Sequence, residues 1–387
     1  MVDYRPGLDG VIATQSSISD IDGKNGILSY RGYSIEELAK TSSFEEVAYL
    51  LMAGELPKKS QLETFKSDIN KNQNLPENLI KFLNSLPKDT DSMQVLQMTA
   101  ASLGTFYPIK FDSEKAKAKE YKLDYFLDIA AKLIGSLGSV VPAWHRIRFN
   151  KKTIPSQNKL NFADNFLNML DDENESSDLV RRIMDATFIL HAEHTINAST
   201  FTAMVTASTL SKPFQVISSA IGSLAGPLHG GANQKVVSML EKIGKKENVR
   251  SWLEKTLNEK KVVWGMGHRE YSVKDPRANI LTTMTKELFD EKGDDVSDLF
   301  DTAIELESAC NETLSKKGVY ANVDFYSGIL YREMGIPVDL FTTVFAISRV
   351  SGWVAHWAEQ ISDNKIFRPT QIYQGSSSRK YIKINDR

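Results

Sequence analysis

Helical periodicity over most of the chain is the feature that most restricts its fold. The clearest case begins at Ser43, which forms a capping box with Glu46, continues as an apolar face over residues 47–51, and closes at Gly54. The same pattern recurs to the C-terminus, with Gly or Pro at most breaks and few alternating β-branched runs. The sequence therefore predicts an all-α protein built of many short helices.

One segment near the N-terminus departs from this pattern. Residues 16–33 alternate polar and apolar side chains around Asp22-Gly23 and Asn25-Gly26, which are two strong turn signals. We expect a small β-hairpin in this segment.

Length and charge limit the class of protein. A chain of 387 residues is long enough for two or three structural units. Lys and Arg number 47 and Asp and Glu number 49, so the net charge is −2, which argues against a nucleic-acid-binding protein. Any anionic ligand must therefore be met by local cations.

Cysteine usage and hydropathy bear on the compartment. Cys310 is the single cysteine, so neither an intrachain disulfide nor a thiolate zinc cluster can form, and a reducing, cytoplasmic location is expected. The N-terminal residues lack the basic start and apolar core of a secretory signal. The most apolar stretch, residues 336–357, is interrupted by Asp339 and Arg349, so we expect no membrane-spanning helix.

Two of the six histidines follow an apolar stripe at helical spacing. The stripe runs from Leu179 to Leu190, and His194 continues it one turn later, so His194 is predicted to point inward from this helix. It is then either a hydrogen-bonded core histidine or part of a site. A metal site formed by His191 and His194 is a weaker interpretation, because Glu193 between them does not give the HExxH geometry.

Glycines surround two further histidines. His229 lies in GPLHGGAN just before an amphipathic helix, whose positive end disfavours imidazolium, so we expect a neutral, hydrogen-bond-donating His229. His268 lies in GMGHREYSVKDPR, also before a helix start. Glycine costs backbone entropy that a purely structural segment would avoid, so both segments favour a site over incidental histidines in turns.

Two charged residues stand in apolar surroundings. Asp324 lies among Val323, Phe325 and Tyr326, which raises the pKa of a carboxyl group and suits a general base working near neutral pH. The alternative is that Asp324 is a helix N-cap. Arg349 interrupts an apolar helix and needs an anion, either a buried Asp or Glu or a bound carboxylate.

Four segments together resemble the citrate synthase family in order and spacing: GPLHGGAN, GMGH with DPRA, ANVDFYSG and ISRVSGW. The opening DIDGKNGILSYRGYSIEELA is similar to the compact prokaryotic branch, and the resemblance extends from about Gly7 to Lys380. It implies the condensation of acetyl-CoA with oxaloacetate to citryl-CoA, followed by hydrolysis to citrate and CoA. The family needs no metal and no tightly bound cofactor, because the CoA thioester is a substrate.

The resemblance also implies roles for the catalytic residues. Asp324 matches the base that removes a methyl proton from the thioester. His229 matches the neutral histidine that hydrogen-bonds the enol or enolate oxygen, and His268 the histidine that polarises the ketone of oxaloacetate. A base and an oxyanion-type donor on opposite sides of one small group are what carbon acid chemistry requires.

Further positions match the family's substrate-binding residues. His194 matches a histidine that binds oxaloacetate, and Arg277 and Arg349 match arginines that bind its carboxylates. Arg368, in IFRPTQ, matches a third arginine supplied by the partner subunit of a homodimer. Bidentate guanidinium groups suit a dicarboxylate.

One departure from the family concerns CoA. Glu270 stands where the family usually has an aliphatic residue and Ser272 where it usually has a basic one, near the CoA phosphates. A carboxylate there would repel the phosphates. We expect the nearby Arg269 and Lys274 to compensate for this repulsion, and they are the predicted CoA contacts.

The family fold implies two helical domains that close over the substrate. The predicted large domain comprises residues 1–229 and 336–387, and the small domain residues 230–335. Three other functions stay open: a 2-methylcitrate synthase that uses propionyl-CoA, a CoA-binding paralogue without activity, and a metal-dependent hydrolase that uses His191 and His194. One extra methylene is worth only ~1–3 kcal/mol of discrimination, so the sequence does not separate the two synthases.

Overall fold

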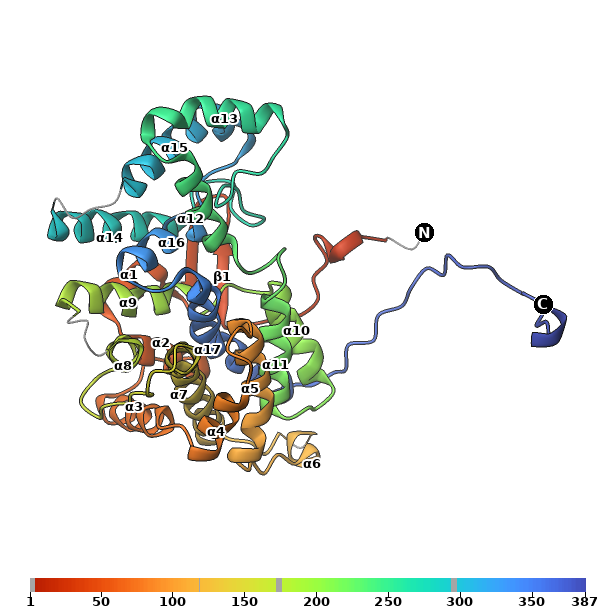
Figure 1. Cartoon of the computed structure of the whole chain (residues 1–387). Coiled ribbons are helices and arrows are strands. Elements are labelled where there is room, and N and C mark those ends of the chain that lie inside the picture. The colour runs from red at the N-terminus through yellow and green to blue at the C-terminus, as the bar shows by residue number, and fades with distance from the viewer. Residues whose placement is uncertain (1–3, 118, 172–175, 294–297) are drawn as a thin grey trace.

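Helices form almost all of the regular structure in this computed structural model, which describes residues 4–117, 119–171, 176–293 and 298–387 (Figure 1). The predicted all-α class is confirmed. The first ten helices are α1 (Ile35–Thr41), α2 (Phe44–Ala53), α3 (Lys59–Gln73), α4 (Glu77–Ser85), α5 (Ser92–Phe106), α6 (Ser113–Lys117), α7 (Leu123–Arg148), α8 (Phe162–Leu170), α9 (Asp178–His191) and α10 (Ala198–Ser208). The others are α11 (Pro213–Leu224), α12 (Ala232–Ile243), α13 (Val249–Asn258), α14 (Pro276–Lys292), α15 (Leu299–Leu314), α16 (Val323–Glu333) and α17 (Phe341–Ser362).

The predicted N-terminal hairpin is also confirmed. Strand β1 (Ser19–Asp22) pairs antiparallel with β2 (Ile27–Tyr30), with Ser19 opposite Tyr30, and the short β3 (Tyr33–Ser34) extends the sheet. Asp22 closes the turn, because its side chain accepts the backbone N–H groups of Lys24 and Asn25.

Helix α2 begins and ends where the sequence predicts, with one difference at its start. Ser43 Oγ accepts the backbone N–H of Glu46, and Gly54 ends the helix in the left-handed region with φ +85°. The Glu46 carboxylate, however, accepts the hydroxyl of Ser42 at 2.6 Å instead of the backbone N–H of Ser43. The neighbouring serine therefore replaces the second half of the predicted capping box.

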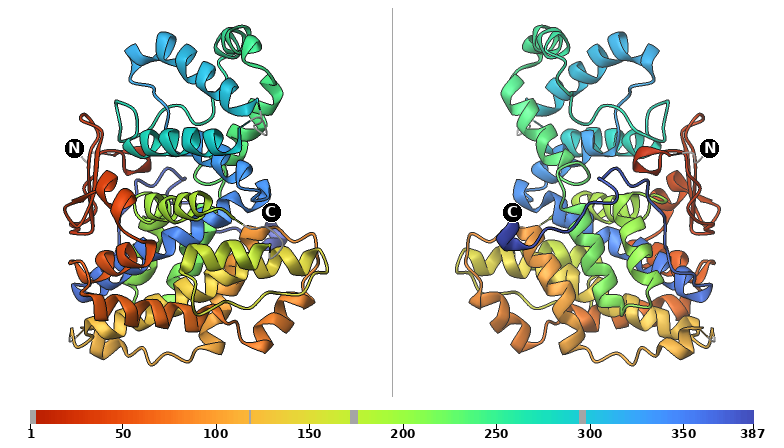
Figure 2. Two further views of the ribbon diagram at one scale, coloured as in Figure 1. Left: turned by 90° about the vertical axis from the view of Figure 1, so that its left-hand side faces the viewer. Right: turned by 90° about the vertical axis from the view of Figure 1, so that its right-hand side faces the viewer.

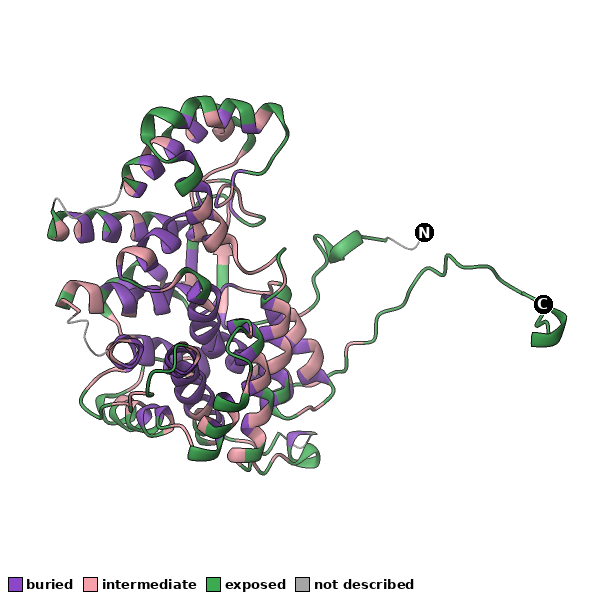
Figure 3. Cartoon of the chain, viewed as in Figure 1, coloured by how far each residue is buried: buried purple, intermediate pink, exposed green. Residues whose placement is uncertain are grey.

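The two longest helices, α7 and α17, form the centre of the body and are buried along most of their length (Figure 3). Two helical segments, Leu123–Arg148 and Val338–Ser362, are long and apolar enough to pass a composition test for membrane spans, contrary to our expectation for the second. In each, 83% of the apolar stretch is buried inside the protein. Packing against the surrounding helices accounts for this apolar composition, as in the core helix of a soluble protein.

Helices α12 to α16 gather at one end of the molecule, at the top of Figure 1, and Figure 2 shows the same grouping from two sides. The predicted small domain, residues 230–335, contains these five helices. Of the predicted site residues, the three histidines lie in loops. Arg277, Asp324 and Arg349 lie in helices α14, α16 and α17.

Both ends of the chain extend away from the body (Figure 1). Phe367 still packs edge-on against Phe201 of α10, with ring centroids 5.4 Å apart. Beyond it, residues 368–387 are exposed, although they include large apolar side chains such as Tyr373, Tyr381 and Ile384. Exposed apolar side chains on an extended segment are typical of a surface that binds another molecule.

Candidate active site

His194 lies in a loop after α9, so its predicted place on that helix is wrong. The helix ends at His191 because its last carbonyl groups and those just beyond it find partners outside the helix. The Tyr30 hydroxyl donates to the carbonyl of Glu193 at 2.7 Å, and the Gly352 N–H donates to the carbonyl of Ala192 at 3.2 Å. Asn197 then caps α10 through the N–H groups of Ser199 and Thr200.

His194 is nevertheless buried and faces a second histidine. Its ring centroid is 5.0 Å from that of His268, and its Nε2 is 3.2 Å from the hydroxyl of Tyr271. Burial, aided by Arg277 and His268, lowers the pKa of His194 well below 6.5. His194 is therefore neutral near pH 7 and can share one hydrogen bond with a ligand.

His268 is oriented by its own loop. Its Nδ1 accepts the backbone N–H groups of Glu270, at 3.0 Å, and Tyr271, at 3.4 Å. Because a backbone N–H only donates, Nδ1 is unprotonated and the proton of the neutral ring is on Nε2. Burial and the charge of Arg277 lower the pKa of His268 to about 4, so the ring is a neutral donor through Nε2.

Asp324 is the second residue of α16, and Asn322, not Asp324, caps this helix. The alternative role of Asp324 as an N-cap is thereby removed. Burial raises the pKa of Asp324 to about 6, although Arg277 and Arg349 oppose this effect. The residue is partly accessible, and its carboxyl group has the pKa of a general base that works just above pH 6.

The segments that carry His268 and Asp324 are joined through Asn322. The Asn322 side chain donates to the carbonyl of Gly267 at 2.8 Å, and its backbone N–H donates to the carbonyl of Gly265 at 2.9 Å. The histidine and the acid are therefore placed by one shared set of hydrogen bonds.

His229 lies between α11 and α12 and faces the N-terminus of α10. Its Nε2 is 3.3 Å from the backbone nitrogen and 2.8 Å from the hydroxyl of Ser199, the second residue of α10. Because that N–H donates to Nε2, the proton of the neutral ring is on Nδ1. Burial and Arg349 lower the pKa of His229 to about 4. The prediction of a neutral His229 is confirmed. The N–H group that the ring meets, however, belongs to α10 and not to α12, the helix that follows His229 in the sequence.

Arg277 is buried and paired. Its Nε and Nη2 donate to the two carboxylate oxygens of Asp275 at 3.0 and 2.8 Å, and the Asp275 side chain also accepts the backbone N–H of Arg277. This fork leaves Nη1 of Arg277 for a ligand. Asp275 thus orients the guanidinium and neutralises its charge.

Arg349 has no such partner in the described ranges of the chain. It is 1% exposed, its Nε donates to the carbonyl of His191 at 2.6 Å, and its guanidinium carbon lies 4.7 Å from the centre of the Phe345 ring. Among the residues that the structure describes, no carboxylate forms an ion pair with it. Burial lowers the pKa of Arg349 to about 10, although Glu193 opposes this effect, so the group stays charged. Of the two anions considered for Arg349, a bound carboxylate is therefore favoured.

Arg368 lies outside this cluster. In the described chain its guanidinium contacts only the carbonyl of the adjacent Pro369, at 2.9 Å, and the residue is exposed. The structure of one chain therefore does not bring Arg368 to the histidines.

The two cations predicted to contact CoA differ in their surroundings. Arg269 is exposed. The Lys274 ammonium lies 2.6 Å from Glu307 Oε1 of α15, and 5.2 Å from the centre of the Tyr326 ring. Because Lys274 already neutralises a mostly buried carboxylate, Arg269 is the freer of the two cations.

The surroundings of His191 and His194 argue against the metal-dependent hydrolase that would use both of them. His191 Nδ1 is 2.8 Å from the carbonyl of Thr187, and its ring packs edge-on against Phe345, whereas His194 meets Tyr271. The two histidines therefore do not converge on one point. In the part of the chain that the structure describes, no group of three or more His, Cys, Asp or Glu side chains is arranged to hold a metal ion.

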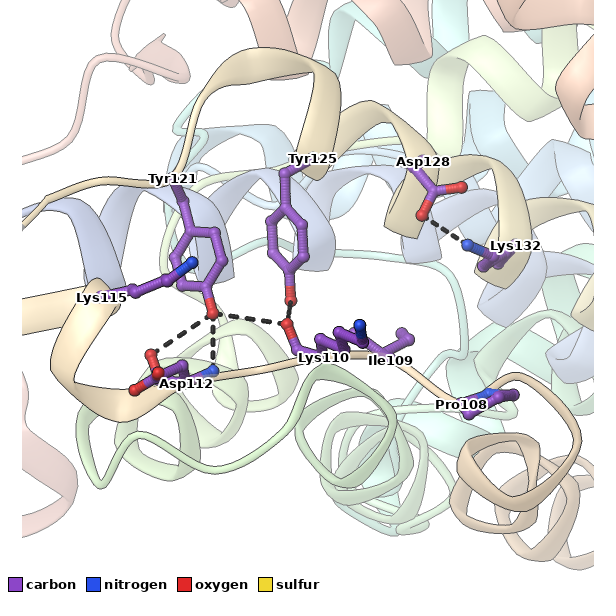
Figure 4. A pocket seen from close by; sticks show the side chains of 9 residues that line it. All are labelled: Pro108, Ile109, Lys110, Asp112, Lys115, Tyr121, Tyr125, Asp128 and Lys132. Carbon is purple, nitrogen blue, oxygen red and sulfur yellow. Dashed lines mark hydrogen bonds and ion pairs between the residues drawn. The ribbon is translucent and has the colours of Figure 1, made fainter.

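A surface cavity of about 390 Å³ lies elsewhere, beside α6 and the start of α7 (Figure 4). Its two tyrosine hydroxyls, of Tyr121 and Tyr125, both point to the backbone carbonyl of Lys110, and Lys132 pairs with Asp128. The cavity includes none of the site residues predicted from the sequence.

The sequence did not single out several polar residues that organise the site. Each lies within five residues of a predicted site residue, and that proximity was the available signal. They are Glu193, Ser199, Tyr271, Asp275 and Asn322.

The fold and the site together define an all-α enzyme. Its site holds neutral histidines, a carboxyl group with a raised pKa, and a buried arginine that has no ion-pair partner in the described part of the chain. A family model described as "Citrate synthase, C-terminal domain" matches residues 7–370. The chain is 47% identical to a citrate synthase of Acidithiobacillus ferridurans, covering 99% of this chain and 98% of that one, and 46% identical to one of Synechocystis sp., covering 99% and 94%. This chain therefore belongs to the citrate synthase family.

Solved structures of citrate synthases have the same fold as this chain. Citrate synthase from Pyrobaculum aerophilum has a TM-score of 0.92 at 36% identity, covering 99% of this chain and 95% of that chain. Citrate synthase from Thermoplasma acidophilum, solved as a ternary complex with carboxymethyl coenzyme A and oxaloacetate, has a TM-score of 0.90 at 30% identity, with both chains covered completely.

Proposed function

We propose that this protein condenses acetyl-CoA with oxaloacetate and water to give citrate and CoA. The observation that carries the proposal is that the guanidinium of Arg349 is buried without an ion-pair partner in the described chain. It lies close enough to His194, His229 and Asp324 to affect their pKa values. A buried, unpaired cation is costly unless a ligand supplies the anion. A carboxylate of oxaloacetate is the proposed anion.

The first chemical step is proton removal from the methyl group of acetyl-CoA. Ionised Asp324 accepts this proton, and the electron pair of the C–H bond moves toward the thioester oxygen. The Nδ1–H of neutral His229 donates a hydrogen bond to that oxygen. A neutral imidazole that is already oriented can donate this hydrogen bond to the developing negative charge on the enolate oxygen.

The second step is attack on the ketone of oxaloacetate. The Nε2–H of His268 polarises the ketone oxygen. As the enolate carbon bonds to the ketone carbon, the π electrons of the C=O bond move to the oxygen, which is protonated to the hydroxyl group of citryl-CoA. His194 and Arg277 help to bind the ketone substrate, with the free Nη1 of Arg277 and the guanidinium of Arg349 directed at carboxylates. Water then hydrolyses the thioester of citryl-CoA and releases CoA.

Domain closure would protect the enolate. The two units proposed from the sequence, residues 1–229 with 336–387 and residues 230–335, contribute different site residues, so the site is complete only when they approach each other. Exclusion of water prevents premature protonation of the enolate.

A homodimer is proposed as the working form, in the cytoplasm. The extended, exposed C-terminal segment with its apolar side chains suits binding to a second copy of the chain. Arg368, which contacts no other site residue of its own chain, would then complete the carboxylate site of the partner subunit. Oxaloacetate and acetyl-CoA are the proposed substrates.

The test is a measurement of free thiol released by the purified protein. Release from acetyl-CoA only in the presence of oxaloacetate supports the proposal. Release without oxaloacetate would identify a plain thioesterase, and no release under either condition would identify a paralogue without activity. A parallel series with propionyl-CoA distinguishes a 2-methylcitrate synthase, which would have the higher kcat/KM with propionyl-CoA.

A further inference from the structure

The N-terminal hairpin contacts two loops of the site, one at each of its ends. Its base, at Ser19 and Tyr30, touches the loop that carries His194, and its turn, at Gly23, touches the loop that carries His268. A strand rises ~3.4 Å per residue, so the four residue steps from Ser19 to Gly23 span ~14 Å between the two contacts.

The contacts at the base are hydrogen bonds from two strands. Ser19 Oγ accepts the backbone N–H of Thr195 at 3.2 Å and donates to Glu193 Oε1 at 3.1 Å. Tyr30, which pairs with Ser19 in the sheet, donates to the carbonyl of Glu193 at 2.7 Å. The hairpin therefore forms hydrogen bonds to Glu193 and Thr195, the two residues that flank His194.

The contacts at the turn bring the backbone of residue 23 directly against the loop that carries His268. The Gly23 carbonyl accepts the backbone N–H of Ser272 at 3.0 Å and its hydroxyl at 3.3 Å. A Cβ at position 23 would lie 1.8 Å from the carbonyl oxygen of Glu270 and 2.7 Å from its carbonyl carbon. The turn can approach the loop this closely only because residue 23 is glycine.

The part of the loop that Gly23 contacts is also the part that orients His268. The N–H groups of Glu270 and Tyr271 are the donors to His268 Nδ1, and Tyr271 in turn contacts His194 through its hydroxyl. A shift of this backbone would weaken the hydrogen bonds that keep the ring proton on Nε2.

We infer that the β1–β2 hairpin is a positioning element that sets the orientation of His268 relative to His194, with Gly23 as its contact residue. The inference rests on the proposed function, because His268 is taken as the donor to the ketone. Nothing in the hairpin touches substrate in this scheme, so Gly23 acts through the 270–272 backbone.

The test uses three alanine variants. Gly23 does not have a positive φ, so Gly23→Ala is unstrained at its own backbone and acts through the clash with Glu270 alone. Gly26→Ala and Gly32→Ala form a matched pair, because both glycines have a positive φ, +67° and +86°. A Cβ on Gly26 would lie 2.9 Å from Val273 Cγ2, whereas a Cβ on Gly32 would meet no atom of the described residues within 4 Å.

Three quantities are measured for each variant: kcat, the thermal unfolding midpoint, and the carbon-13 resonance of the ketone carbon of bound oxaloacetate. Gly23→Ala should lower kcat by about 10- to 100-fold, as expected for a misplaced catalytic group. The ketone resonance should move toward that of free oxaloacetate, because the donor is misaligned. Gly32→Ala should lower the unfolding midpoint slightly and leave kcat and the resonance unchanged, while Gly26→Ala should resemble Gly23→Ala.

The outcomes separate the inference from the proposed function. Absence of wild-type activity would refute the function, whatever the variants do. With wild-type activity present, the inference is overturned if Gly23→Ala keeps the wild-type kcat, or if kcat falls without a shift of the ketone resonance. If Gly23→Ala does not fold, the same two criteria, kcat and the ketone resonance, are applied to Gly26→Ala, with Gly32→Ala as its control.

Discussion

Replacing Asp324 by Asn should inactivate the protein and, above pH 6, stabilise it. Burial raises the pKa of the Asp324 carboxyl from 3.8 to about 6. Each pKa unit corresponds to ~1.4 kcal/mol, so ionised Asp324 lowers the free energy of unfolding by on the order of 3 kcal/mol. Asn carries no charge and avoids this cost, while the loss of the base should lower kcat by at least ~10²-fold.

The sign and the pH range follow from the two pKa values. Below pH 3.8 the carboxyl group is protonated in both the folded and the unfolded chain, and it contributes no difference. Between pH 3.8 and about 6 the unfolded chain releases its proton first, so the free energy of unfolding of the wild type falls as pH rises. Above about pH 6 the penalty is constant, and at pH 5 about half of it is present.

Thermal unfolding of the wild type and of Asp324→Asn from pH 4 to pH 8 measures this difference. We expect the unfolding midpoints to be closest at pH 4 and to separate, with the variant higher, up to about pH 6.5. The change with pH in the difference between the two unfolding midpoints reports the effect of the Asp324 charge alone, because any cost of burying the Asn amide is independent of pH. The wild-type kcat should fall in parallel as pH is lowered through about 6, since protonated Asp324 cannot act as a base.

A gap that is constant from pH 4 to pH 8, or one that grows toward low pH, would refute the reasoning. The first result would mean that Asp324 titrates normally and is better solvated than the structure indicates. The second would mean that the arginines outweigh burial and lower its pKa. A variant that keeps wild-type kcat would show that another group is the base.

The remaining predictions concern the partner subunit, CoA and metals. Asp324→Ala and Arg368→Ala homodimers should each be nearly inactive, whereas random refolding of an equal mixture should restore about a quarter of wild-type activity, because two-fold symmetry leaves one site of each mixed dimer intact. An inactive mixture in which mass measurement finds mixed dimers would assign Arg368 to its own chain. Glu270→Val combined with Ser272→Lys should lower the KM for acetyl-CoA and make it more sensitive to salt; an unchanged KM would place the phosphates elsewhere or show that existing cations suffice. A chelator should leave the rate unchanged, and a chelator-sensitive rate that added metal restores would contradict the proposed mechanism.

The sequence alone was sufficient for the features that depend on neighbouring residues. Helix α2 with its cap at Ser43 and its end at Gly54, and the hairpin around Asp22-Gly23, depend on side chains that bond to their own backbone within a few residues. The neutral state of His229 was also predicted correctly, although the N–H group that it meets belongs to α10.

Tertiary structure decided the features that depend on residues far apart in the chain. Helical spacing extended α9 to His194, but Tyr30, more than 150 residues away, accepts and donates the hydrogen bonds that end the helix early. Whether Lys274 is free depended on Glu307, and whether Arg349 has an anion depended on which carboxylates fold next to it. Periodicity and spacing report local preference, whereas burial, ion pairing and the tautomers of the site histidines are set by partners that only the folded chain brings together.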